Sequence, residues 1–197
     1  MRKALRNFVG LPFLLVPLFS ACTERGPQAV PVKAIDAYKA AGESSGLVAA
    51  AEAYDTTVKS NDAFGSNVSR DFTPVQLVVE SKAADKLLIQ RNRAKLVCDD
   101  GKTLEPVSAL AMFDKYRLVG SPFFFSRGAY EANRNERIKS DWMQKEFPLE
   151  KILTTGERAA GFLYFQGTCP YRAGRHLHVA ADKMSSSDVV AISFELR

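Results

Sequence analysis

The chain has 197 residues, 27 Lys and Arg against 22 Asp and Glu, and a net charge of +5. This length allows one domain with a substantial core. Arg2, Lys3 and Arg6 precede an apolar run, and without the first 21 residues the count is 24 against 22, a net charge of +2. Charges of both signs are also interleaved over residues 127–146. Because a nucleic-acid-binding face needs concentrated positive charge, we expect no nucleic-acid partner.

Residues 1–21 have the organisation of a secretory signal peptide. The basic residues are followed by the apolar run "FVGLPFLLVPLFSA", and no acidic residue is present. As a helix these 14 residues would span only about 21 Å, short of the roughly 30 Å of a bilayer core, and Pro12 and Pro17 interrupt them. We therefore expect a cleaved signal rather than a permanent transmembrane anchor.

The signal ends in "LFSAC", from Leu18 to Cys22. Ordinary signal peptidase prefers small residues at the first and third positions before the cut, and Phe19 occupies the third. The stretch instead resembles the lipobox of bacterial lipoproteins. That resemblance implies cleavage before Cys22 and acylation of its side chain, and Thr23, which is not aspartate, implies the outer membrane, facing the periplasm. The alternatives are a Cys22 buried in a core or paired in a disulfide.

The other two cysteines are Cys98 and Cys169. If Cys22 takes lipid, an even pair remains in an oxidising compartment, where disulfides persist. The alternative is two separate buried thiols, since a free cysteine often behaves as a small apolar side chain.

Residues 22–45 are interpreted as a tether. They open with "TERGPQAVP" and allow at most a short helix before the Gly and Ser residues near position 45. We expect the folded domain to occupy residues 46–197.

Period-two patterns predict six strands in that domain. They cover residues 46–54, 72–80, 86–98, 161–166, 175–181 and 189–196, and residues 102–104 could add a seventh. In the third, the pattern places Leu88, Ala94 and Leu96 on one face. Helical spacing over residues 105–116 and 130–147 predicts two helices within an insert at about residues 104–147. The expected fold is mainly β, an antiparallel β-sandwich with a helical insertion.

Two stretches carry a second resemblance. "FTPVQLVVESKAADKLLIQRNRAKLVCDDGK" and the later "FPLEKILTTGERAAGFLYFQ" are similar to the immunoglobulin-like domains of many uncharacterised bacterial envelope lipoproteins. The resemblance implies an immunoglobulin-like sandwich and supplies no catalytic residue.

"GESSG" matches the G-x-S-x-G pattern of hydrolases and would make Ser44 a nucleophile. That motif requires a strand-to-helix turn, whereas a predicted strand follows here. We therefore favour a flexible junction.

His176 and His178 alternate with Leu177 and Val179 on a predicted strand. Their imidazoles would project from one face, with Cα atoms about 7 Å apart. Two such groups can bind copper, nickel or zinc when a third ligand joins them. The simpler interpretation places both histidines on the solvent side.

Phe123, Phe124 and Phe125 form the most apolar short run outside the strands and the signal. In an exposed loop they would make a partner or lipid contact. Otherwise they fill a core.

No P-loop, H-E-x-x-H, C-x-x-C or G-x-G-x-x-G motif is present. We therefore expect a non-enzymatic, lipid-anchored module for protein interaction or envelope assembly. It would use no cofactor, contact the membrane through its N-terminal lipid, and have an envelope protein as partner. The alternative is a metal- or small-ligand-binding lipoprotein that uses His176 and His178.

Overall fold

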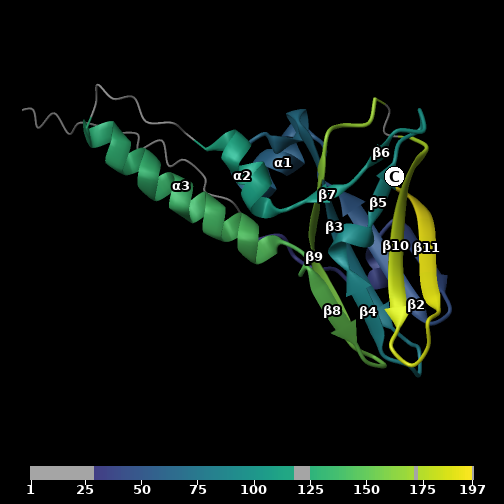
Figure 1. Cartoon of the computed structure of the whole chain (residues 1–197). Helices are drawn as coiled ribbons and strands as arrows, with labels where there is room; N and C mark the ends of the chain where they lie inside the picture. Colours follow the sequence, from purple (N-terminus) through teal and green to yellow (C-terminus); the bar gives the residue numbers. More distant parts are fainter. Residues whose placement is uncertain (1–28, 118–124, 171–172, 197) are drawn as a thin grey trace, which may run out of the picture.

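The computed structural model describes residues 29–117, 125–170 and 173–196 (Figure 1). The fold is mainly β, with antiparallel sheets and three α-helices in this part of the chain. The helices are α1 (Thr57–Phe64), α2 (Ala109–Tyr116) and α3 (Phe125–Lys145), and the 3-10 turns are η1 (Ile35–Ala37), η2 (Val68–Arg70) and η3 (Arg91–Arg93). The strands are β1 (Ala40–Ser44), β2 (Leu47–Ala53), β3 (Phe72–Ser81), β4 (Leu87–Gln90), β5 (Lys95–Val97), β6 (Thr103–Leu104), β7 (Pro106–Val107), β8 (Glu150–Leu153), β9 (Arg158–Gln166), β10 (Arg175–Lys183) and β11 (Val189–Leu196).

Two sheets pack face to face. Sheet A has the order β1-β2-β3-β9-β7, and sheet B has the order β6-β5-β10-β4-β8 with β11 on the other side of β10. Val75 and Leu163 of sheet A meet Leu96 and Ile192 of sheet B in one apolar core. The alternation of β11 follows the prediction, since Ile192 and its even-numbered neighbours are buried while the outward positions are exposed or half-buried.

The opposite face of sheet A is covered by the helices. Phe162 and Tyr164 of β9 pack there against Phe64 of α1 and Trp142 of α3. The Tyr164 hydroxyl donates a hydrogen bond of 2.9 Å to the Trp142 carbonyl oxygen, and the Trp142 Nε1–H donates one of 3.0 Å to the Phe64 carbonyl oxygen. Sheet A is therefore buried on both faces, and the period-two patterns of its central strands do not produce a solvent face.

The N-terminal segment, residues 29–39, completes this covering. Tyr38 is buried with Ala50 and Val78 on the outer face of sheet A. Its hydroxyl donates a hydrogen bond of 3.1 Å to Oε1 of Gln76, and Nε2 of Gln76 donates one of 3.3 Å to the Pro31 carbonyl oxygen. The N-terminal segment thus supplies hydrogen-bond partners to Gln76, a buried polar side chain in the middle of β3.

Strand β1 corrects the predicted domain boundary, which started the folded domain at residue 46. Residues 40–45 were assigned to a tether, but β1 pairs with β2 along its whole length, from Ala40 opposite Ala51 to Ser44 opposite Leu47. The predicted strands do not include β7 or β8, and the predicted helices do not include α1. The Thr56 side chain caps α1 at its start, and Gly65, at φ 65°, ends it in the left-handed region.

The strand predicted over residues 86–98 is two strands separated by η3. Leu87 and Ile89 of β4 face the core, as do Ala94 and Leu96 after the turn. The prediction placed Leu88 on the same face as Ala94 and Leu96, and this was wrong because η3 changes the parity of the inward positions. Leu88 is half-buried, and in the sheet it lies opposite Ile152 of β8.

Gly161 in β9 provides a direct test of this packing. A Cβ atom at Gly161 would lie 2.5 Å from the Phe147 Cα and 2.6 Å from the Phe147 nitrogen, both backbone atoms. We expect Gly161→Ala to lower the free energy of unfolding by about 2 kcal/mol, because backbone cannot yield as a side chain can. Urea denaturation followed by circular dichroism measures the loss.

Gly42→Ala is the matched control. Its Cβ would meet the Ile192 Cγ2 at 2.8 Å, and this methyl group can move away. We expect a smaller loss than for Gly161→Ala, and equal losses in the two variants would contradict the role assigned to the Phe147 backbone.

Candidate functional site

The structure brings together some of the residues that the sequence selected. Cys98 and Cys169 form a disulfide, with Cα atoms 5.3 Å apart across 71 positions of sequence. Cys22, Phe123 and Phe124 lie outside the described residues, and Phe125 is the first residue of α3.

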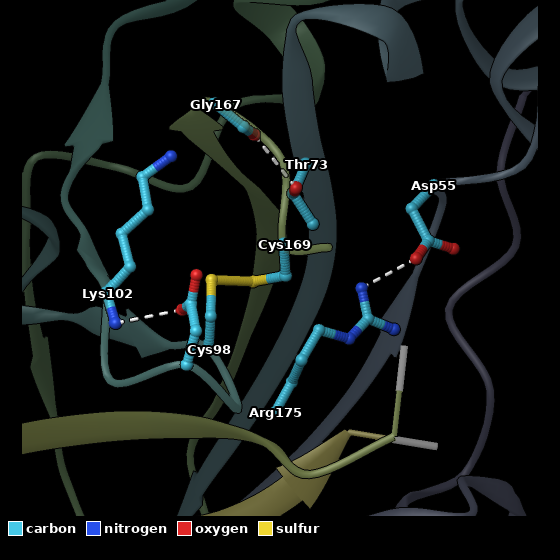
Figure 2. Close-up of a disulfide and its surroundings, with 8 residues drawn as sticks. Asp55, Thr73, Cys98, Lys102, Gly167, Cys169 and Arg175 are labelled. Carbon is cyan, nitrogen blue, oxygen red and sulfur yellow. Dashed lines mark hydrogen bonds and ion pairs between the residues drawn. A yellow bond between two sulfur atoms is a disulfide. The ribbon is translucent and has the colours of Figure 1, made fainter. Parts of the chain in front are cut away.

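The disulfide joins the ends of the two sheets. Cys98 follows β5 of sheet B, and Cys169 follows β9 of sheet A (Figure 2). Close by, Arg175 at the start of β10 makes an ion pair of 2.6 Å with Asp55, which follows β2 (Figure 2). The Arg175 side chain is only 3% exposed, so this pair also links the sheets in a region of low water content.

His176 and His178 lie on the outer face of sheet B, and both are exposed while Leu177 is buried. Lys95 of β5 lies opposite His178. Burial lowers the pKa of His178 below its ordinary value, and the charges of His176 and Lys95 lower it further. Within the described ranges, no group of three or more His, Cys, Asp and Glu side chains gathers to hold a metal ion. Metal binding by these two histidines stays a prediction.

Ser44 is the last residue of β1. The chain turns at Ser45 and Gly46, which have φ values of 47° and 80°, and continues directly into β2. Two positive φ angles in a two-residue connection are typical of a tight hairpin, so the expected flexible junction is an ordered turn. A strand–turn–strand unit also lacks the strand-to-helix turn on which the hydrolase motif depends.

A further site, which the sequence did not indicate, is a cavity of about 490 Å³ on the outer face of sheet A. We call it the cationic pocket. Its lining includes Ala51 and Glu52 of β2, Tyr38 and Lys39 from the N-terminal segment, and two more lysines, Lys33 and Lys59. Three lysines against one carboxylate give these charged side chains a net charge of +2.

Glu52 holds two of the lysines in place. The Lys33 Nζ lies 2.5 Å from Glu52 Oε2, and the Lys59 Nζ lies 2.7 Å from Oε1. Burial raises the pKa of Glu52, but hydrogen bonds from both lysines and their charges outweigh it, so the pKa lies below its ordinary value. Glu52 is therefore an anion at neutral pH.

Aromatic rings also support the same lysines. The Lys33 Nζ lies 5.6 Å from the centre of the Tyr38 ring, and the Lys59 Nζ lies 5.5 Å from that of Tyr54. Burial and the negative charge of Glu52 raise the pKa of Tyr54 to about 12, so its ring stays neutral and attractive to a cation.

The comparisons with known proteins add little. No protein-family model matches the chain, and no curated protein matches it. Among solved structures, the yjhA protein from Bacillus subtilis is similar with a TM-score of 0.38 and 8% identity, over 72% of this chain and 78% of that one. A likeness at this level supports no inference about function.

Across the described residues, no helix is both long enough and apolar enough to cross a membrane.

The disulfide generates a testable prediction. Reducing the Cys98–Cys169 bond should lower the free energy of unfolding by about 4 kcal/mol, because it releases a long closed loop in the unfolded chain. Urea denaturation with and without reductant measures the difference. The double variant Cys98→Ala, Cys169→Ala is the control and should not respond to reductant; equal stability of reduced and oxidised wild-type protein would refute the prediction.

Proposed function

We propose that this protein is a lipoprotein of the outer membrane, anchored through acylated Cys22 and facing the periplasm, and that it acts as a non-enzymatic interaction or envelope-assembly module. The observation that carries the proposal is the Cys98–Cys169 disulfide. The chain has three cysteines, so this bond leaves Cys22 as the one outside it. A disulfide between sheets suits an oxidising compartment, and a secretory signal ending in a lipobox leads to one.

The fold limits how far the domain can stand from its anchor. The described chain begins at Ala29, and Pro31 and Tyr38, a few residues later, contact Gln76 of sheet A. Only six residues separate Cys22 from Ala29, and the seven Cα-to-Cα steps between them span at most about 25 Å. The tether is thus much shorter than the predicted 22–45, and the anchored domain is held close to the membrane.

We further propose that the two sheets form an immunoglobulin-like sandwich. The support is their antiparallel pairing and the single core between them. The helices lie outside this core, on the outer face of sheet A, in agreement with an insertion into a β framework.

Helix α3 supports the interaction role. It is 21 residues long and extends away from the two sheets (Figure 1). Among its residues 131–145, only Glu131, Ile138 and Trp142 are buried, so most of this length contacts solvent. Over residues 131–145 this mostly exposed helix offers a surface to another protein, and Phe123 and Phe124 precede its first residue, Phe125, in the sequence.

The anchor can be tested at the N-terminus. Mass spectrometry of protein isolated from its native membrane should show a chain beginning at acylated Cys22. Cys22→Ser should abolish both the acyl mass and the membrane association, because the modification needs the thiol. Cys98→Ser is the matched control, and it should keep the acylated Cys22. A wild-type chain that begins elsewhere would overturn the proposal.

The interaction surface can be tested with the triple change of Phe123, Phe124 and Phe125 to Ala. Crosslinking in the native membrane should capture an envelope protein with wild type and lose it with the triple variant, while the free energy of unfolding stays within about 1 kcal/mol of wild type. If the rings fill a core, the variant should instead lose several kcal/mol of stability.

The control for this test is the double change Leu110→Ala, Met143→Ala. Both residues are exposed apolar side chains on α2 and α3. This variant should retain the captured partner, and a loss equal to that of the triple variant would remove the specific role of the three phenylalanines.

A further inference from the structure

The cationic pocket has the properties of a binding site for an anion. Glu52 is ionised and holds Lys33 and Lys59 on its two oxygens, and Lys39 is exposed and makes no ion pair within the described part of the chain. Each ammonium has three donors. Lys33 uses one on Glu52, and Lys59 uses one on Glu52 and one on the Ala53 carbonyl oxygen at 3.3 Å. Donors remain on all three lysines.

Lys33 and Lys59 are ordered before any ligand arrives. Their ammonium groups are fixed by one carboxylate, and their contacts with the Tyr38 and Tyr54 rings restrict the side chains further. A binding site with such preorganisation loses less entropy when it captures a ligand. Surface lysines without this support would lack that advantage.

The charge and volume of the cationic pocket indicate the class of ligand. A phosphate monoester carries a charge of about −1.5 to −2 at neutral pH, which balances the net +2 of the lining. Lysines are common phosphate ligands because each acts as a compact positive charge. A cavity of about 490 Å³ is far larger than a phosphate group needs, and it is in the range of small-molecule pockets. Ala37 and the Tyr38 ring provide apolar surface for the remainder of the ligand.

We propose that the cationic pocket, formed by Lys33, Lys39, Lys59 and Glu52, binds a phosphate group carried on a small organic moiety. Two sources can supply such a group: a soluble phosphate monoester, whose charge balances the lining, and the headgroup of a phospholipid, a phosphodiester with a single negative charge that would leave part of the positive lining unbalanced. The pocket does not depend on the lipid anchor, so the proposal stands or falls separately from the acylation of Cys22.

The test uses the full chain in a non-ionic detergent and calorimetric titration with three probes. These are glycerol 3-phosphate, the short-chain lipid dihexanoyl phosphatidylglycerol, and glycerol as the uncharged control. We expect at least one phosphate probe to bind with one-to-one stoichiometry and glycerol to give no heat. Tighter binding of the lipid assigns the pocket to a headgroup, and tighter binding of glycerol 3-phosphate assigns it to a soluble ester.

Lysine variants locate the bound phosphate. Lys33→Gln and Lys59→Gln should each weaken binding about tenfold, since each removes a charged donor. Lys82→Gln is the matched control, because Lys82 is an exposed lysine paired with Glu43 at 3.0 Å and does not line the pocket. Lys33 and Lys59 are also partly exposed, so their variants should keep the wild-type unfolding midpoint.

Two results would overturn the proposal. One is the absence of binding for both phosphate probes to the wild-type protein. The other is an equal weakening by Lys82→Gln, Lys33→Gln and Lys59→Gln, which would show a general response to net charge.

Discussion

Strands β3 and β9 pair through nine residue pairs, from Phe72 opposite Gln166 to Glu80 opposite Arg158. Both faces of this central pair are removed from water, one by sheet B and the other by the helices and the N-terminal segment. An open antiparallel sheet can leave one face wet, but these strands carry large apolar side chains on both sides. The helical layer and the N-terminal segment are therefore required by the sheet, since without them Phe162 and Tyr164 would be exposed.

Besides the aromatic packing on sheet A, the helical layer is joined to both sheets at a junction where the chain leaves α3. Glu146 forms an ion pair with Arg91 of η3 and accepts a hydrogen bond of 2.7 Å from the Ala109 nitrogen at the start of α2. The next residue, Phe147, donates its N–H to the Phe162 carbonyl oxygen at 2.9 Å and packs in the core between the sheets. Sheet A, sheet B and the helices therefore meet at two consecutive residues. The close approach at Gly161 follows from this arrangement.

The sequence predicted the long strands well because their alternation is a local property of the chain. β2, β3, β9, β10 and β11 all coincide with predicted strands, and α2 and α3 with predicted helices. The prediction of the face that Leu88 occupies was wrong because a 3-10 turn in a polar run leaves no periodic signal. The cationic pocket was missed because it combines a supposed tether, a strand and the unrecognised helix α1. The available sign was Glu52, a single charge in an otherwise apolar strand, since a carboxylate in that setting requires partners.

The N-terminal segment and the cationic pocket share the outer face of sheet A, whereas His176 and His178 lie on the outer face of sheet B. If Cys22 carries lipid, a tether of at most about 25 Å keeps the sheet A side near the bilayer. The helices cover this same side, so a partner of α3 would bind close to the membrane surface. The same geometry brings the lysines of the cationic pocket within reach of phosphate headgroups, while the two histidines face the opposite direction. An envelope partner and a phosphate ligand would then be engaged by one side of the domain.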